Sequence, residues 1–252
     1  MFGEWKALSF GSYLAPASPL ASDGGFDVVW HFHACRAADK DWRALDARVV
    51  VVCINNLGMG TAPYWDAFAD AARFGKLEAE VERAIAKDAG VASAHVATRT
   101  LVAWSAGYAS VQQILAVDRY YASTSAVVLL DGLHAGYTRA PDGTPTKTPR
   151  LDTVGPILRF AEDAAAGKKT FVFTHSAVIP PDYASTTEMA RALEQRLGMQ
   201  SSSSDGDFPG AIDVADRGNS HVRGFEGGEA KDHIAQLHLV TTALTKWVLP
   251  KR

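Results

Sequence analysis

Short apolar runs alternate with amphipathic stretches along most of the chain. The clearest run, residues 48–54, reads Arg-Val-Val-Val-Val-Cys-Ile, and such a near-continuous apolar segment is typical of a parallel strand covered on both faces. Similar patterns predict further strands at residues 7–13, 26–33, 100–104, 123–130, 168–174 and 221–225. The last of these closes a segment, 211–225, that holds one or two strands.

Segments with helical periodicity lie between the predicted strands. They predict helices at residues 39–45, 65–88, 151–166, 185–197 and 234–249, and one more that follows the strand at 100–104 and ends near residue 115. The helix from 185 opens with Ser-Thr-Thr-Glu, the pattern of a capping box. Residues 136–149 read as a polar loop, and the segment 132–150 is too short for a sizeable lid domain. Residues 200–210 read as a flexible surface loop.

The alternation of strands and helices predicts the fold class. It favours an α/β protein in which a mostly parallel sheet is covered by helices on both faces, as a three-layer α/β/α sandwich. The length of 252 residues suits a single domain that spans 1–252.

Composition narrows the range of partners. With 47% hydrophobic and 21% charged residues, a net charge of −3 and no basic run, nucleic acid is not an expected partner. No apolar stretch approaches the roughly 20 residues of a membrane span. The N-terminus lacks the apolar core of a signal peptide, so we expect a soluble protein, either cytoplasmic or secreted with its signal peptide removed. The two cysteines, Cys35 and Cys53, lie in or beside apolar strands and are predicted to be buried free thiols.

Polar side chains that could take part in catalysis or binding gather where the predicted strands end. In a parallel sheet, working residues lie beyond the carboxyl ends of the strands. The residues at these ends include His31, His33, Ser105, Asp131, His134, His175 and Ser176, with His233 in the loop before the last helix.

Ser105 has the sequence context of a nucleophile elbow. It lies between a predicted strand and a predicted helix, with Ala103 and Gly107 two positions away on either side. A nucleophile elbow places serine on a strained strand-to-helix turn, where bulky neighbours would clash. The alternative is a serine that only caps the helix.

A serine nucleophile needs a base and an acid that orients the base. His233 is the best candidate base, because the preceding Gly227 and Gly228 let its loop reach inward; the alternative is a histidine at a helix start. Asp131 is the best candidate acid, since it follows four apolar strand residues directly, where an unpaired carboxylate would be costly. The alternative interpretation is that Asp131 only forms a turn. Asp182 is the other candidate for the acid.

An oxyanion hole needs backbone donors aimed at the developing charge. One predicted donor is the amide of Ala106, directly after the nucleophile. The other is expected from Ala34 or Cys35, in the loop after the strand that contains His31 and His33.

The order Ser105, Asp131, His233, with an elbow after a central strand and a histidine-containing loop after an early one, resembles the α/β-hydrolase fold of serine esterases and lipases. The resemblance covers nearly the whole chain at the level of motif order and implies a Ser-Asp-His triad. In that family the acid usually follows the strand two after the nucleophile; some lipase-like members place it one strand earlier, which matches Asp131. The family's His-Gly oxyanion signature is replaced here by His33-Ala34.

The other polar and aromatic residues near the predicted site are candidates for lining a substrate pocket. They are His33, Trp104, His134, His175, Ser176, Tyr64 and Trp65. Alternation along a strand would place His31 and His33 on one face, where they could bind zinc together with His134 and His175. We favour pocket or structural roles for these histidines, and we expect no metal and no cofactor.

The predicted function is therefore a serine hydrolase that cleaves a carboxylic ester through an acyl-enzyme on Ser105, with a thioester or amide as other substrates. The expected partner is a small-molecule or lipid-like ester, and the oligomeric state stays open. Two alternatives are a zinc-dependent hydrolase built on His31 and His33, and a hydrolase fold that binds without catalysis.

Overall fold

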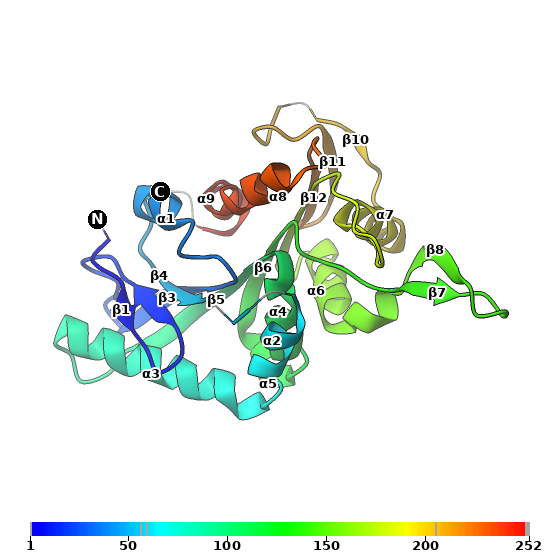
Figure 1. The fold of residues 1–252 in the computed structure, drawn as a ribbon. Coiled ribbons are helices and arrows are strands. Elements are labelled where there is room, and N and C mark those ends of the chain that lie inside the picture. The colour runs from blue at the N-terminus through cyan, green and yellow to red at the C-terminus, as the bar shows by residue number, and fades with distance from the viewer. Residues whose placement is uncertain (1, 56, 59, 205, 250–252) are drawn as a thin grey trace. The chain divides into compact units, whose positions relative to one another are not determined.

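The computed structural model describes residues 2–55, 57, 58, 60–204 and 206–249, which fold as a mixed α/β protein (Figure 1). They form two compact units, one of residues up to Ala126 with Leu249 and one of Val127–Val248, and the boundary falls within strand β6. The single domain predicted for 1–252 stays a prediction.

The first unit contains five strands in the order β1-β2-β4-β3-β5 among its described residues. β3 is parallel to β4 and β5, whereas β2 is antiparallel to β4 and to β1. These strands are β1 (Lys6–Ala7), β2 (Ser12–Leu14), β3 (Gly25–Phe32), β4 (Val49–Ile54) and β5 (His95–Trp104). The helices are α1 (Asp39–Ala44), α2 (Ala62–Ala67), α3 (Ala71–Ala89), η1 (Ser105–Gly107), α4 (Tyr108–Leu115) and α5 (Asp118–Ser123).

Strand β3 is buried on both faces, as its apolar sequence predicts. Consecutive residues of a strand point to opposite faces, and Trp30 contacts Phe74 of α3 while His31 contacts Trp42 of α1. The predicted helix at 65–88 is instead two helices, α2 and α3. Asp70 begins α3, because its side chain accepts a hydrogen bond from the Ala72 amide and so caps the helix.

The second unit contains the strand order β6-β9-β12-β11-β10. β12 is parallel to β9, while β11 is antiparallel to both β12 and β10. These strands are β6 (Thr124–Leu130), β9 (Thr170–His175), β10 (Ser202–Ser203), β11 (Asp213–Arg217) and β12 (Ser220–Gly224). The helices are η2 (Leu151–Val154), α6 (Gly155–Ala165), α7 (Thr186–Leu197), α8 (Ala230–Leu237), α9 (Val240–Ala243) and η3 (Leu244–Val248). The predicted last helix at 234–249 is therefore divided into three segments, and the capping box at Ser185 is confirmed.

The expectation of a mostly parallel sheet is wrong. Antiparallel pairs occur at the outer strands of both units, so the sheet structure is mixed. These outer strands are short and partly polar, and hydrophobic periodicity gives only a weak signal for such segments.

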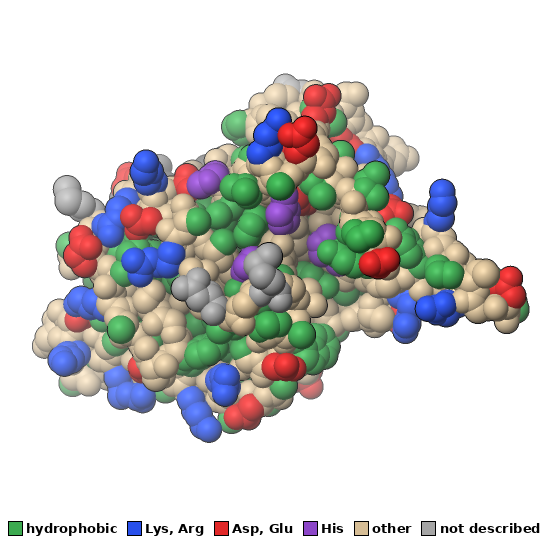
Figure 2. Space-filling model, viewed as in Figure 1, with side chains coloured by type: hydrophobic (Ala, Val, Ile, Leu, Met, Phe, Trp, Pro, Cys, Tyr) green, Lys and Arg blue, Asp and Glu red, His purple; other side chains and the backbone are tan. Residues whose placement is uncertain are grey.

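The segment 136–149, predicted to be a polar loop, contains a hairpin. Its strands β7 (Tyr137–Arg139) and β8 (Pro145–Pro149) pair antiparallel in a separate two-stranded sheet. The hairpin projects from the second unit on the right of Figure 1, and the projecting arm in Figure 2 carries charged side chains toward its end. None of the helices in the described part of the chain is long and apolar enough to cross a membrane.

Candidate active site

Ser105 occupies a strand-to-helix turn in the first unit. It follows β5 directly, begins the short helix η1 and has a backbone φ of 50°. This left-handed region is uncommon for residues other than glycine and is a recurrent form of strain at functional sites. A strand, a strained turn and a helix therefore follow one another at Ser105, which is the geometry that the predicted elbow requires.

Gly107 is required by a close approach between two elements. A Cβ atom at this position would lie 2.3 Å from the backbone oxygen of Phe32, the last residue of the neighbouring strand β3. Ala103, two residues before the serine, is fully buried and pairs with Phe32 in the sheet. The packing of the elbow against β3 therefore explains the small residues on both sides of Ser105.

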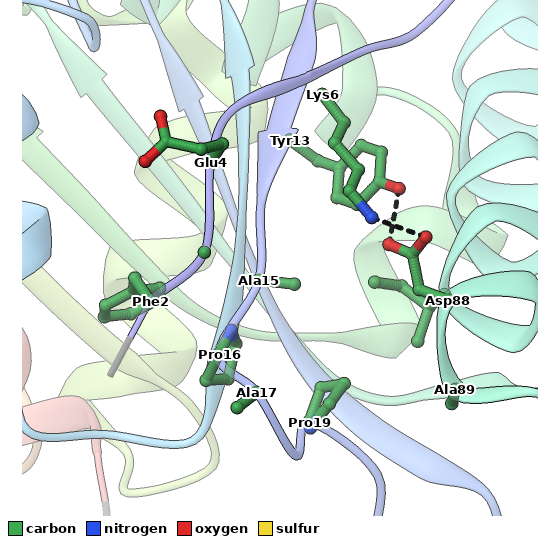
Figure 3. A pocket seen from close by; sticks show the side chains of 12 residues that line it. Phe2, Glu4, Lys6, Tyr13, Ala15, Pro16, Ala17, Pro19, Asp88 and Ala89 are labelled. Carbon is green, nitrogen blue, oxygen red and sulfur yellow. Dashed lines mark hydrogen bonds and ion pairs between the residues drawn. The ribbon is translucent and has the colours of Figure 1, made fainter.

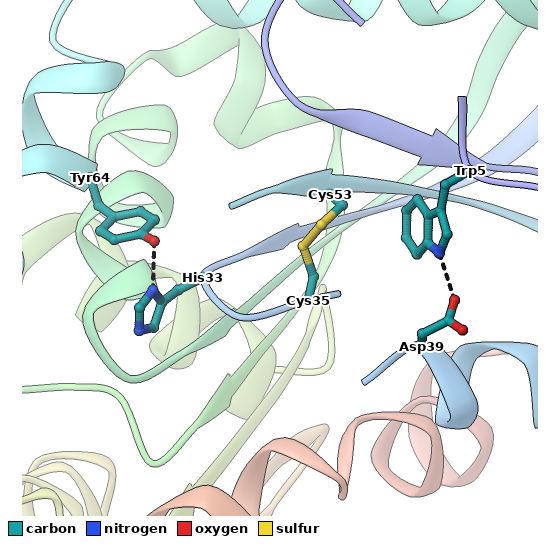
Figure 4. The surroundings of a disulfide bond; sticks show 6 residues. All are labelled: Trp5, His33, Cys35, Asp39, Cys53 and Tyr64. Carbon is teal, nitrogen blue, oxygen red and sulfur yellow. Dashed lines mark hydrogen bonds between the residues drawn. A yellow bond between two sulfur atoms is a disulfide. The ribbon is translucent and has the colours of Figure 1, made fainter. Parts of the chain in front are cut away.

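The loop after β3 also has an unusual backbone. His33 and Ala34 have φ values of 70° and 55°, and the His33 amide donates to the Ile54 oxygen at 3.0 Å. The next residue, Cys35, forms a disulfide with Cys53 of β4 (Figure 4). The prediction that both cysteines are free thiols is therefore wrong. The two residues meet because β3 and β4 are adjacent, and Cys53 lies opposite His31, close to the end of β3. The sequence does not show which strands are neighbours.

His33 is held by two aromatic side chains of the same unit. Its Nδ1 lies 2.5 Å from the Tyr64 hydroxyl, and its ring stacks on Trp104 at a centroid distance of 5.0 Å and an interplanar angle of 8°. Tyr64 is fully buried, so its side chain supports the loop rather than lining an open pocket. Trp65 is 44% exposed.

The second unit joins the predicted acid and base. Asp131 follows β6 directly with a φ of 44°, and its Oδ2 lies 2.7 Å from Nδ1 of His233, in the first turn of α8. The Asp131 side chain is 1% exposed and that of His233 is 25% exposed. The rival acid Asp182 is exposed. Asp131 and His233 are 102 positions apart in the sequence, so it is the fold that brings this pair together.

Asp131 accepts three more hydrogen bonds. The amide and hydroxyl of Ser176 donate at 2.9 and 2.5 Å, and the Thr186 hydroxyl donates at 2.5 Å. Burial raises the pKa of the Asp131 carboxyl, but the bonds from His233, Ser176 and Thr186 outweigh it, so the net pKa lies below its usual value. Ser176, predicted at the pocket, is fully buried and donates to the Asp131 carboxylate. Sequence reasoning missed Thr186, the first residue of α7.

His134 and His175 are oriented by their Nδ1 atoms. His134 Nδ1 lies 3.0 Å from the Ala184 oxygen, which can only accept, so this nitrogen carries the proton. His175 Nδ1 lies 2.9 Å from the Thr187 hydroxyl, which itself donates to the Ser176 oxygen. Burial lowers the pKa of both imidazoles, that of His175 to about 4. His175 is 4% exposed and so packs within its unit rather than on a surface.

The geometry of His31 and His33 differs from a shared zinc site. His33 lies beyond the end of β3 with a positive φ, so the alternation that predicted a common face ends before it. His31 is fully buried against Trp42, and burial lowers its pKa to about 3. Across the described ranges, no three histidine, cysteine, aspartate or glutamate side chains are grouped as metal ligands.

A cavity of about 420 Å³ lies elsewhere in the first unit, at the β1–β2 edge (Figure 3). The Asp88 carboxylate in its wall accepts from Lys6 at 2.6 Å and from Tyr13 at 2.7 Å. These charged and polar groups satisfy one another, and none of the predicted site residues lines the cavity.

No protein-family model matches the chain, and no curated protein matches its sequence. An uncharacterised protein from Capnocytophaga ochracea has a similar structure, with a TM-score of 0.51 at 8% identity over 97% of this chain and 64% of that one. This likeness shows a shared fold, and the chain spans less than two thirds of that protein. Siderophore hydrolase EstB from Aspergillus nidulans (12% identity, 99% and 96% covered) and a bifunctional GH43-CE protein from Bacteroides eggerthii (12%, 94% and 36%) each give a TM-score of 0.44.

Proposed function

We propose that the protein is a serine hydrolase of the α/β-hydrolase type that cleaves a carboxylic ester. The observation that carries this proposal is the Asp131–His233 hydrogen bond, in which a buried carboxylate accepts from Nδ1 of a partly exposed imidazole. That arrangement leaves Nε2 of a neutral His233 as the basic nitrogen. The strained turn at Ser105 supports the same reaction.

In the proposed reaction, Ser105 Oγ attacks the acyl carbon while His233 Nε2 removes its proton. The imidazolium is stabilised by Asp131 and then protonates the leaving alkoxide, which departs as the alcohol. Water, deprotonated by His233, then attacks the acyl-enzyme, and His233 returns that proton to Ser105 Oγ as the acyl–oxygen bond breaks and the carboxylic acid leaves. The amide of Ala106, together with that of Ala34 or Cys35, would stabilise the oxyanion in both steps.

A fluorophosphonate probe tests the nucleophile. We expect the wild-type protein to be labelled at Ser105 and to hydrolyse p-nitrophenyl esters, and we expect Ser105→Ala to lose both properties while keeping its circular dichroism spectrum. A series of acyl chain lengths, with matched thioesters and amides, would define the substrate. A folded wild-type protein with neither labelling nor hydrolysis would refute the proposal.

The acid is tested by a matched pair of variants. Asp131→Asn should lower kcat by about a thousandfold or more, because the amide no longer fixes the working tautomer of His233. Asp182→Asn makes the same chemical change at an exposed residue and should leave kcat nearly unchanged. The reverse order would assign the acid to Asp182.

A further inference from the structure

Tyr64 contacts both segments that the proposed mechanism uses as sources of oxyanion donors. Its side chain packs with Ala106 and Ala109, and the Ser110 hydroxyl donates to its backbone oxygen at 2.8 Å. Its own hydroxyl lies 2.5 Å from Nδ1 of His33 (Figure 4). One buried residue of α2 is therefore connected to the elbow and to the loop after β3.

The hydrogen bonds of Tyr64 determine the tautomer of His33. The phenol oxygen of Tyr64 accepts a hydrogen bond from the backbone amide of Leu57. Burial raises the pKa of Tyr64, and this bond acts in the opposite direction. The single hydroxyl hydrogen then has His33 Nδ1 as its acceptor. If Nδ1 carried the proton instead, the buried hydroxyl hydrogen would have no acceptor among the described residues, at a cost of about 1–3 kcal/mol. His33 is thus a neutral imidazole protonated on Nε2.

The backbone beside His33 needs such support. Two consecutive non-glycine residues, His33 and Ala34, have left-handed φ values, and such strain persists only where the surroundings fix it. The Tyr64 hydrogen bond and the Trp104 stack fix the His33 ring in two directions. The backbone that follows carries the amides of Ala34 and Cys35.

We propose that Tyr64 is a positioning residue that sets the placement of both oxyanion donors. It does so through packing against Ala106 on one side and through the Nε2-protonated tautomer of His33 on the other. The proposal rests on the proposed serine hydrolase function. Tyr64 does not touch the substrate in this scheme; it acts through the residues whose amides do.

The principal test compares Tyr64→Phe with Tyr13→Phe. Both variants remove a buried tyrosine hydroxyl from the first unit, but Tyr13 donates to Asp88 in the separate cavity. Tyr64→Phe should lower kcat about tenfold or more, because small misplacements of catalytic groups have large effects, with KM changed less than threefold. Affinity for an aryl boronic acid, which forms a tetrahedral adduct with serine, should fall in parallel. Tyr13→Phe should change neither quantity.

A second pair of variants separates positioning from folding. His33→Asn keeps an acceptor near the Nδ1 position and a residue that tolerates positive φ, whereas His33→Ala has neither property. We expect His33→Asn to retain at least tenfold more kcat than His33→Ala. Equal activity of these two variants, or wild-type kcat and boronate affinity in a folded Tyr64→Phe protein, would overturn the proposal.

Nitrogen-15 NMR tests the tautomer independently of hydrolysis. His33 Nδ1 should have the shift of an unprotonated nitrogen in the wild-type protein and should lose that fixed state in Tyr64→Phe. A protonated Nδ1 in the wild type would overturn the inference even if the enzyme is active. Failure of the wild type to cleave esters or react with the probe would instead refute the proposed function and leave the tautomer result intact.

Discussion

At the scale of single residues, Asp131 shows how a carboxylate stays ionised while hidden from water. Its side chain is almost fully buried, which favours the neutral acid, yet four donor groups surround its two oxygens. Hydrogen bonds to an ionised group contribute more than neutral ones, about 1.5–3 kcal/mol each. The donors just after β9 and at the start of α7 therefore keep the Asp131 carboxylate ionised beside its imidazole partner.

The Thr186–Asp131 bond predicts a pH-dependent stability defect. Thr186→Val, which removes the hydroxyl with little change of shape, should lower the free energy of unfolding at pH 7 by about 1.5–3 kcal/mol. A carboxyl whose folded-state pKa is depressed stabilises the fold above its unfolded-state pKa, and this contribution is lost as pH falls through the folded-state pKa. The difference in free energy of unfolding between the wild type and Thr186→Val should therefore become smaller below about pH 4.

Urea unfolding at several pH values from 7 to 3 measures this effect. Thr124→Val is the matched control, since the buried Thr124 hydroxyl donates to the backbone carbonyl oxygen of Tyr120 at 2.7 Å, and this acceptor carries no charge. Its defect should stay constant with pH. A Thr186→Val defect that is equally constant would mean that the Thr186 bond does not depend on the charge of Asp131.

Sequence reasoning reached Asp131 but not the residues that hold it. An aspartate after four apolar residues is conspicuous because its burial would be costly alone. Thr186 gives no such signal: it follows a capping serine in an ordinary helix start, and only the packing of α7 brings it to Asp131. Ser176 was predicted near the site, but its bond to the acid depends on the path of the chain after β9.

At the scale of elements, the elbow depends on how closely η1 approaches β3. Gly107 has an ordinary helical φ of −60°, so glycine is needed there for space and not for conformational freedom. The added Cβ would meet backbone, which cannot rotate away as a side chain can. Strand periodicity predicted the turn, while the contact that dictates Gly107 comes from a strand some 75 residues earlier in the chain.

A matched pair of glycine substitutions measures this contact. Gly107→Ala should destabilise the protein by at least about 2 kcal/mol, because overpacking against Phe32 forces a backbone shift. Gly155→Ala, at the helical start of α6 where a Cβ has open space, should be neutral or stabilising by up to about 1 kcal/mol. Chemical denaturation gives both values. Similar stabilities for the two variants would show that η1 can move away from β3 without cost.

Strand adjacency and element ends were the main properties that the sequence left undetermined. The long apolar strands were predicted because they are buried on both faces, as in β3 and β4. The Cys35–Cys53 disulfide was missed because pairing requires knowledge that these strands are neighbours.

At the scale of the whole molecule, the proposed reaction uses Ser105 as its nucleophile and His233, far along the chain, as its base. The rate of fluorophosphonate labelling at Ser105 should therefore depend on His233. We expect His233→Ala to slow labelling by about a hundredfold or more, since the serine loses its base. Added imidazole should restore part of the rate, because it can occupy the space that the truncated side chain vacates and accept the same proton.

His238→Ala is the control for that experiment, because His238 is an exposed histidine that follows the same helix. It should label at close to the wild-type rate. Slow labelling of both variants would indicate that each substitution disrupts α8. Imidazole would then restore the labelling rate of neither variant. Undiminished labelling of a folded His233→Ala protein would separate the reactive serine from the Asp131–His233 pair. The elbow would then still define a reactive serine, but its base would have to come from another residue.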